Sequence, residues 1–234
     1  ADGLGPGAVG EYPWVGAQGH GSVDQATAAQ AIADQGRGAL AEAEVEYMDK
    51  TSTAIDVGFA VIDSAELHRR AGLAGSAPVL VPIWTTTAWT LPANQAVALG
   101  AELEYRLIEA ELGNGPVRLV LAAELADSAL ARYGAKSATV LATFSGQVLE
   151  GLKLLHPFYA REVPVILADY VTLDAGTGAV HTAPGHGQDD YQSGLRYKLP
   201  LDNPVDGPGR LPVARWRRGG RARHQGRLAA SPRP

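Results

Sequence analysis

The sequence predicts a mainly β protein with some α structure, built on a closed or nearly closed β-barrel core with short helices at its periphery. Many short apolar runs, only a few short helical patterns and no regular alternation of strand with helix favour this class. Closure of the barrel would also leave no strand edge exposed. With 234 residues, 46% hydrophobic and 19% charged, the chain has the composition of a globular protein that can bury one good core.

The N-terminal part of the chain changes in character along its length. Residues 1–22 are rich in Gly and are expected to form a loop, whereas the Ala-rich residues 24–35 can form a short helix. Apolar residues then alternate at period two over 45–47 and 55–61, on either side of a turn at 50–53. This pattern predicts two half-buried strands.

A short helix and an apolar strand are expected next. Asp63 followed by Glu66 resembles a capping pair and predicts a helix over 65–73. The apolar run 79–84 favours a strand, and this strand ends in a cluster of threonines at 85–87.

A hairpin signal dominates the middle of the chain. Gly113-Asn114-Gly115 separates the strands expected at 105–110 and 117–122. A helix over 123–133 should follow and end at the next glycine. The remaining expected elements are strands at 139–144, 163–167 and 179–182, and a final helix that begins near Asp189 and runs through Tyr197.

Composition disfavours several functional classes. The chain has no cysteine, so disulfides and thiolate metal sites are excluded. It has no run of about 18 apolar residues and no secretion signal, so we expect a cytoplasmic protein without a membrane span. Neither a Walker sequence nor a dinucleotide-binding glycine motif occurs.

Charge is unevenly distributed along the chain. Residues 210–234 contain eight Arg and no acidic residue, and the other 209 residues carry 12 basic against 25 acidic side chains. The basic tail could bind phosphates through counterion release. A solvated, disordered extension is the simpler interpretation.

The sequence Trp-Thr-Thr-Thr-Ala-Trp-Thr-Leu-Pro-Ala-Asn at 84–94, called the threonine segment below, concentrates hydrogen-bonding groups at a strand end. Successive side chains of a strand alternate, so three consecutive threonines cannot all face the core. Pro92 restricts the backbone, and Asn94 adds both a donor and an acceptor. These groups could bind a small polar ligand, or they could bond only to the local backbone.

The sequence Val-His-Thr-Ala-Pro-Gly-His-Gly-Gln-Asp-Asp-Tyr at 180–191, called the histidine segment, places two imidazoles and a carboxylate among glycines that allow close approach of a ligand. Asp190 could bind a ligand. Alternatively, either Asp189 or Asp190 could cap the helix that follows. A metal-dependent hydrolase using His181 and His186 is a further alternative, but the cluster lacks a Glu general base beside it. The sequence contains neither a Gly-x-Ser-x-Gly elbow nor a cysteine, so it does not support a covalent nucleophile.

Three further motifs accompany the two segments: Ala-Leu-Ala-Glu-Ala-Glu-Val-Glu-Tyr at 39–47, His-Pro-Phe at 156–158 and Asp-Ala-Gly-Thr-Gly-Ala-Val at 174–180. Together, over residues 39–210, they resemble the editing domain of bacterial-type isoleucyl-tRNA synthetases. The resemblance implies the class I synthetase editing-domain fold. It also implies hydrolysis of valine mis-esterified to isoleucine tRNA, and of valyl-adenylate. Such a second site is needed because one missing methylene gives only ~1–3 kcal/mol of discrimination, a range for which this synthetase is itself the standard example.

The resemblance implies a role for each site residue. Thr86 and Asp190 would be catalytic, and Asp190 would pair with the α-ammonium group of the substrate. His181 would border the side-chain pocket and exclude isoleucine. Water would be the nucleophile, oriented by these groups without a cofactor or a metal. The substrate-binding residues would be Thr85, Thr87, Thr90, Asn94 and His181.

The chain also departs from the family. The family usually has proline where this chain has Ala88, so the loop has one restricted φ fewer. The synthetic-site motifs His-Ile-Gly-His and Lys-Met-Ser-Lys-Ser are absent, and aminoacylation is not expected from this chain. Residues 1–38 and 211–234 do not match, and we interpret them as a flexible N-terminal segment and a disordered Arg-rich tail of a fragment.

Two hypotheses about activity remain open at this point. The chain could be an active deacylase, either alone or with the rest of a synthetase. Alternatively, it could be an inactive or truncated folded module that only binds the tRNA 3′ end or a partner.

Overall fold

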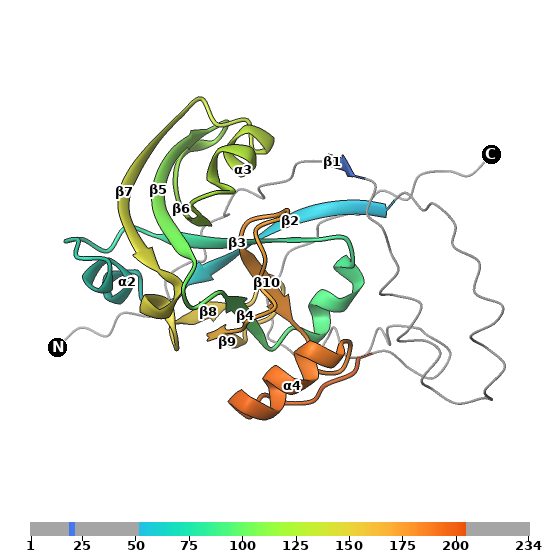
Figure 1. Cartoon of the computed structure of the whole chain (residues 1–234). Helices are drawn as coiled ribbons and strands as arrows, with labels where there is room; N and C mark the ends of the chain where they lie inside the picture. Colours follow the sequence, from blue (N-terminus) through green and yellow to red (C-terminus); the bar gives the residue numbers. More distant parts are fainter. Residues whose placement is uncertain (1–18, 22–51, 205–234) are drawn as a thin grey trace, which may run out of the picture.

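The computed structural model describes residues 19–21 and 52–204 of the chain (Figure 1). The helix expected at 24–35, the strand expected at 45–47 and the tail at 211–234 lie outside these residues, as does most of the N-terminal segment. Within the described part, no helix is long and apolar enough to cross a membrane.

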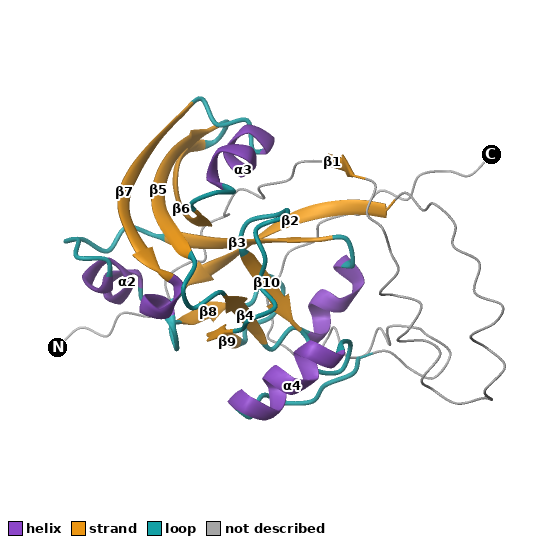
Figure 2. Ribbon diagram, in the orientation of Figure 1, coloured by secondary structure: helices purple, strands orange, loops and turns teal. Residues whose placement is uncertain are grey.

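One large mixed β-sheet dominates the described part, with short helices at its periphery (Figure 2). The strands are β1 (Gly19–Gly21), β2 (Ser52–Val61), β3 (Val79–Thr85), β4 (Ala96–Leu99), β5 (Glu104–Leu112), β6 (Gly115–Ala122), β7 (Ser137–Ser145), β8 (Lys153–Leu155), β9 (Glu162–Leu167) and β10 (Ala179–Thr182). Their order in the sheet is β10-β4-β9-β8-β2-β3-β6-β5-β7, and β1 pairs with the start of β2. The β3–β6 and β4–β9 pairs are parallel.

The sheet curls, so that β10 at one end of this order also packs against β3. Tyr105 of β5 supports the curl, because its hydroxyl accepts a hydrogen bond from the Gly100 amide (3.0 Å) and donates one to the Gly178 carbonyl (2.6 Å), just before β10. Gly178 has a positive φ, and a Cβ there would lie 2.3 Å from the Ala122 methyl group. The predicted mainly β fold with short peripheral helices is confirmed.

Apolar side chains from most strands fill the interior of the curl. Fully buried members of this core include Phe59, Ile83, Leu99, Leu107, Leu154 and Val165. A second cluster joins the other face of β5 and β6 to helix α3 (Ala126–Arg132). Full burial of one such side chain contributes about 1.5–3 kcal/mol, so this core rigidly supports the strands β3, β4 and β10 that carry the two segments.

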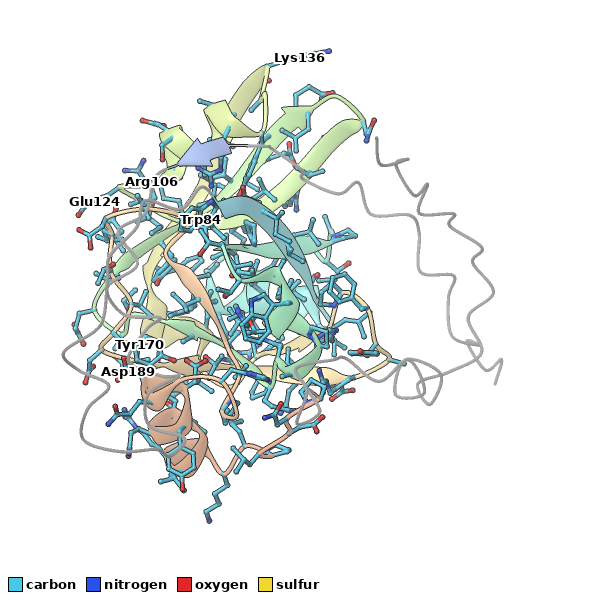
Figure 3. All side chains as sticks on the ribbon, turned by 90° about the vertical axis from the view of Figure 1, so that its right-hand side faces the viewer. Trp84, Arg106, Glu124, Lys136, Tyr170 and Asp189 are labelled. Carbon is cyan, nitrogen blue, oxygen red and sulfur yellow. The ribbon has the colours of Figure 1, made fainter. Side chains whose placement is uncertain are left out.

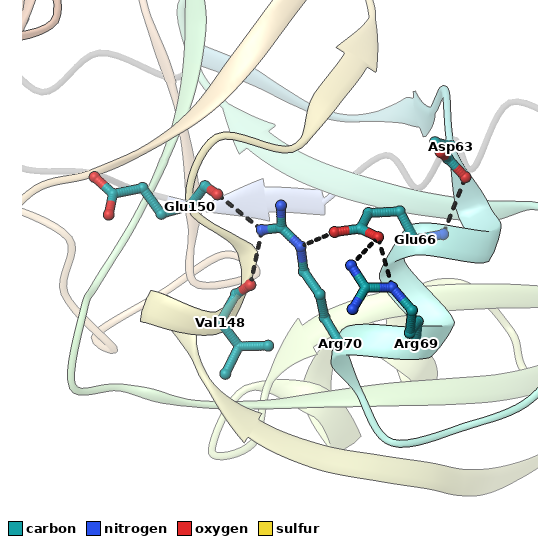
Figure 4. A network of polar contacts seen from close by, with 6 residues as sticks. All are labelled: Asp63, Glu66, Arg69, Arg70, Val148 and Glu150. Atoms are coloured by element: carbon teal, nitrogen blue, oxygen red, sulfur yellow. Dashed lines mark hydrogen bonds and ion pairs between the residues drawn. The ribbon is translucent and has the colours of Figure 1, made fainter.

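Helix α2 (Ser64–Arg70) confirms the capping signal in the sequence. The Asp63 carboxylate accepts a hydrogen bond from the Glu66 amide at 3.0 Å. Glu66 pairs with two arginines of the same helix, and one of these, Arg70, also donates to the carbonyls of Val148 (3.1 Å) and Glu150 (2.9 Å) (Figure 4). The helix is therefore capped locally and is also fixed to a distant turn.

The strands β5, β6 and β7 with helix α3 form a unit of neighbouring elements, called the β5–β7 unit below (residues 104–145). The predicted hairpin is confirmed: Leu112 pairs with Gly115, and Gly113 and Asn114 make the turn. Helix α3 starts at Ala126 and not at the expected residue 123, because the Ala123 amide donates to the Glu104 carbonyl (2.8 Å) and continues the ladder.

Four short elements of the structure were not predicted from the sequence. They are the 3₁₀ helices η2 (Ala88–Ala93) and η3 (Gly146–Leu149), and the strands β4 and β8. Strand β4 is buried on both faces, so it shows no alternation, and β8 is three residues long. Strand β2 also starts within the residues expected to form a turn at 50–53.

Candidate functional site

Topology brings the threonine segment and the histidine segment together. The threonine segment connects the end of β3 to β4 through η2. Strand β4 pairs with β10 in antiparallel register, Ala96 opposite Thr182, and the Gln95 amide donates to the Thr182 carbonyl at 2.8 Å. The histidine segment contains the end of β10 and continues into helix α4 (Gln188–Tyr197). Two parts of the chain about 90 residues apart therefore lie next to each other.

Side chains of the two segments are also in direct contact. The Thr90 hydroxyl lies 3.0 Å from Nε2 of His181. The rings of Trp89 and His186 meet edge to face, with their centroids 5.5 Å apart. Trp89 is 55% exposed, and no signal in the sequence assigned it to the site. These contacts place the two segments side by side.

Three threonine hydroxyls shape the backbone of the threonine segment. Thr85 is buried, and its hydroxyl oxygen accepts a hydrogen bond from the Thr87 amide (3.0 Å) and lies 3.2 Å from the Thr87 hydroxyl. Thr90 is also buried, and its hydroxyl donates to the Thr87 carbonyl (2.8 Å). Thr86 lies between these groups at the strand end and is half-buried. Bonds to the local backbone therefore account for part of this cluster.

The hydrogen bonds of Thr90 determine the tautomer of His181. The single hydroxyl proton of Thr90 goes to the Thr87 carbonyl, so Nε2 of His181 carries a proton and donates it to the Thr90 oxygen. Burial, and secondarily the nearby His186, lowers the pKa of His181 to about 4. The ring is thus neutral at pH 7, and Nδ1 is an acceptor.

In the described part of the chain, four buried side-chain polar atoms have no protein partner, and three of them belong to the two segments. Within the described residues they are Asn94 Oδ1, His181 Nδ1, His186 Nε2 and Arg161 Nε. The Asn94 amide group itself donates to the Ala96 carbonyl at 2.7 Å, which directs the side chain. An unpaired buried polar group costs about 1–3 kcal/mol, so such atoms indicate a place where a ligand or water completes the hydrogen bonding.

Asp190 connects helix α4 to the strand end. Its carboxylate accepts a hydrogen bond from the Ala183 amide at 2.9 Å. The N-cap of α4 is Gly187, without a side-chain cap bond, so the alternative that Asp189 or Asp190 caps this helix is wrong. Burial raises the pKa of Asp190, the Ala183 amide opposes this rise, and Asp189 adds to it. A half-buried carboxylate in this position favours a cationic partner.

A shallow hollow of about 340 Å³ lies on another side of α4 and contains none of the predicted site residues. It is lined by Leu167, Ala168, Asp169, Tyr170, Asp189, Gln192, Ser193 and Arg196. Figure 3 shows Tyr170 and Asp189 at the end of the molecule that carries α4, far from Lys136. The Tyr170 hydroxyl lies 3.1 Å from the Thr182 hydroxyl, which packs this wall against β10.

No group of three or more His, Asp or Glu side chains that could hold a metal occurs in the ranges 19–21 and 52–204. His181 and His186 both contribute to the site, but each has a different surrounding: His181 bonds to Thr90, and His186 packs against Trp89. Burial lowers the pKa of His186 as well, although nearby Asp202 opposes this shift.

Comparison with known proteins adds three findings. The family model described as "Leucyl-tRNA synthetase, editing domain" matches residues 128–226. The chain is 62% identical over 173 residues to the isoleucine–tRNA ligase of Nitrosococcus oceani, 63% over 177 residues to that of Alkalilimnicola ehrlichii, and 54% over 174 residues to that of Coxiella burnetii. These matches cover 73–74% of this chain and 18–19% of the relatives, so the chain spans less than a fifth of their length.

Solved structures agree at the level of the fold. GlLeuRS-CP1 matches with a TM-score of 0.53 at 15% identity, over 69% of this chain and 75% of that one. The cytosolic leucyl-tRNA synthetase editing domain of P. knowlesi matches with a TM-score of 0.53 at 12% identity, over 62% and 64% of the two chains. At this level of identity, the similarity concerns the fold alone.

Proposed function

We propose that this chain, which carries an editing domain of the isoleucyl-tRNA synthetase family, hydrolyses the ester that joins valine to isoleucine tRNA. Valyl-adenylate would be a second substrate, and residues 39–210 would form the working unit. The proposal includes the cytoplasm as the place of reaction, and the rest of a synthetase as a possible partner for holding the tRNA.

The hydrogen bond between Thr90 and His181 is the observation that carries this proposal. It joins the two segments and leaves Nδ1 of a neutral, buried imidazole without a protein partner. A rigid ring in this position would border the amino acid side chain and reject the larger isoleucine. Rejection by a clash requires rigidity, and the bond to Thr90 supplies it.

Asp190 would receive the α-ammonium group of the aminoacyl ester. A half-buried carboxylate next to a cation forms a charge-assisted hydrogen bond, which is stronger than a neutral one. Thr85, Thr86, Thr87 and Asn94 would hold the ester and the terminal adenosine and would orient the attacking water. Catalysis would then depend on orientation and not on a side-chain nucleophile.

Deacylation of valyl-tRNA specific for isoleucine tests the proposal. The purified 234-residue chain should release valine well above the rate in buffer. Asp190→Asn should lower the rate by roughly 10- to 100-fold, because it removes a hydrogen bond to a charged group worth about 1.5–3 kcal/mol. Asp189→Asn is the matched control, since Asp189 is exposed, and it should change the rate by less than about twofold.

Absence of valine release above background would contradict the enzymatic proposal. If the chain still bound the tRNA 3′ end under those conditions, the binding-only module would be the correct interpretation.

A second variant tests the size limit. His181→Ala should allow hydrolysis of isoleucyl-tRNA, which the unmodified protein should leave intact. A variant that loses activity on valyl-tRNA and gains none on isoleucyl-tRNA would show that His181 does not set the size of the pocket.

A further inference from the structure

His156 has no assigned role in the site, yet its buried ring is hydrogen-bonded on both sides. It follows β8 and is 2% exposed. Its Nε2 lies 3.0 Å from the Leu91 carbonyl oxygen, and its Nδ1 accepts from the amides of Phe158 (3.1 Å) and Tyr159 (3.3 Å). Since Nδ1 accepts two hydrogen bonds, the proton is on Nε2 and is donated to Leu91. One tautomer and one ring orientation satisfy all three contacts.

The acceptor of this bond belongs to the threonine segment. Leu91 lies in the last turn of η2, and its carbonyl already accepts one hydrogen bond from the Asn94 backbone amide (2.9 Å), so the His156 ring occupies the second acceptor position of this oxygen. Arg161 donates from Nη2 to the next carbonyl, that of Pro92, at 3.1 Å. Two successive carbonyls of the threonine segment are thus held by residues 156–161, which come 65–69 residues later in the chain.

Aromatic packing fixes the imidazole in place. The centroid of its ring lies 6.0 Å from that of Phe59, 5.6 Å from that of Phe158 and 4.9 Å from that of Tyr159. Phe59 belongs to the main core and is fully buried. The ring that donates to Leu91 is therefore held rigidly by the core, and its hydrogen bond fixes the position of η2 relative to the core.

We propose that His156, assisted by Arg161, is a positioning residue that fixes the C-terminal end of η2 and thereby sets the places of Thr90 and Asn94. Thr90 precedes Leu91 and bonds to His181, and the Asn94 amide donates to the same Leu91 carbonyl at 2.9 Å. The catalytic consequence rests on the proposed deacylation, whereas the structural consequence can be measured without it. A displacement of about 1 Å at a reacting site can lower a rate roughly 100-fold.

Three variants of the full chain test this inference. His156→Phe keeps the ring and removes every polar contact. His156→Gln can place an amide N–H near the position of Nε2 and retain the bond to Leu91. Arg161→Met removes the hydrogen bond to Pro92 and the contact of the guanidinium group with the Tyr159 ring (5.3 Å to the centroid), and it keeps much of the side-chain volume.

His68→Phe is the matched control. His68 is 1% exposed, and its ring also bonds on both sides, to the Ser64 carbonyl (2.6 Å) and to Arg118 Nη1 (2.8 Å). Its partners lie in α2 and β6, so its loss should not reach η2.

Amide hydrogen exchange at Thr90, Asn94 and Leu107 gives the direct readout. In His156→Phe, exchange at Thr90 and Asn94 should rise at least tenfold more than at Leu107 of β5. Arg161→Met should give a smaller rise of the same pattern, and His156→Gln should restore most of the protection. His68→Phe should not raise exchange at Thr90 and Asn94 above that at Leu107. An equal rise at all three amides in His156→Phe and Arg161→Met would overturn the proposal.

Deacylation kinetics give the second readout. His156→Phe should lower kcat at least tenfold with less than about a threefold change in KM, and His156→Gln should recover much of kcat. An unchanged kcat in His156→Phe, with altered exchange, would overturn the link to catalysis. If the unmodified protein shows no deacylation, the proposed function fails, and the exchange pattern still decides the positioning role.

Discussion

The β5–β7 unit and the site lie in different parts of the molecule and are held together differently. Figure 1 shows β5, β6, β7 and α3 at the upper left and α4 at the bottom. The β5–β7 unit is held by backbone ladders between elements close in sequence, with Tyr105 to Leu112 paired residue by residue to β6. The site combines the β4–β10 ladder with side chains that bond across 65–91 residues, such as His156 to Leu91 and His181 to Thr90.

The two regions also differ in how completely their polar groups are paired. Three of the four unpartnered buried polar atoms of the described residues belong to the two site segments, and the fourth belongs to Arg161, which bonds to Pro92. The β5–β7 unit contributes none of these atoms. The difference teaches that one region pairs its buried polar groups internally and the other leaves several of them unpaired, so the same kind of substitution should have different effects in each.

A decrease in pH should produce the largest difference in stability between the site and the β5–β7 unit. Burial lowers the pKa of His156 and of His181 from 6.5 to about 4. A lowered pKa in the folded state means that the stability from each neutral ring is complete above pH 6.5 and is lost as the pH falls toward 4. Each ring should contribute a slope of about 1.4 kcal/mol per pH unit within this window. Asp190, whose pKa burial raises, should act in the opposite direction.

Urea unfolding between pH 7 and pH 4.5 measures this slope. His156→Gln and His181→Gln should each flatten it by about the contribution of one proton. At pH 5, amide exchange at Asn94 should increase before exchange at Leu107 does. A stability that is independent of pH across this window would contradict the assignment of two neutral buried rings.

A core truncation in the β5–β7 unit should give the next largest effect. Leu107 is fully buried in β5, and Leu107→Ala should lower the free energy of unfolding by about 2–5 kcal/mol. Deacylation measured well below the melting temperature should change little, because Leu107 lies in β5, whose backbone pairs with β6 and β7 and not with the strands that carry the two segments. Val140→Ala in β7, where the side chain is 50% exposed, should cost less than about 0.5 kcal/mol. A large loss of kcat in Leu107→Ala at low temperature would break the separation between the two regions.

Replacement of a threonine by valine should have the smallest effect on stability. The same change should, however, affect the site and the β5–β7 unit very differently. Thr90→Val keeps the shape but leaves Nε2 of His181 without its partner, at a cost of about 1–3 kcal/mol, whereas the Thr87 carbonyl keeps the Thr90 backbone amide (2.9 Å). Deacylation should fall about tenfold, since His181 loses its fixed orientation. The same change at exposed Thr139 of β7 should stay within about 0.5 kcal/mol and leave the rate unchanged. Equal behaviour of the two variants would show that the Thr90–His181 bond has no special role.

Local sequence signals predicted much of the fold. The cap of α2 depends on Asp63 and Glu66, three residues apart, and the hairpin depends on the two residues Gly113 and Asn114. In both cases the residues that give the signal are also the residues that make the contact. Strand β10 was predicted at residues 179–182, its observed bounds, for the same reason: its apolar run and its flanking glycines are contiguous.

The chemistry of the site depends on contacts that no local signal reports. An acidic residue near a helix start looks the same whether it caps the helix or, like Asp190, reaches back to the amide of Ala183. The motif that contains His156 resembles that of the family, but its partner Leu91 lies 65 residues earlier in a 3₁₀ helix that has no periodic pattern. The roles of Thr86 and Asp190 in catalysis remain predictions of the resemblance.

The phenol of Tyr105 has a consequence for how the molecule melts. Its hydroxyl is shared between the Gly100 amide and the Gly178 carbonyl, and burial raises its pKa to about 12, so it stays protonated as a donor at neutral pH. Tyr105 thus joins the β5–β7 unit to the backbone next to β4 and β10 by hydrogen bonds that neither acid nor base breaks at moderate pH. Calorimetry should therefore record a single heat-absorption peak, with equal van't Hoff and calorimetric enthalpies.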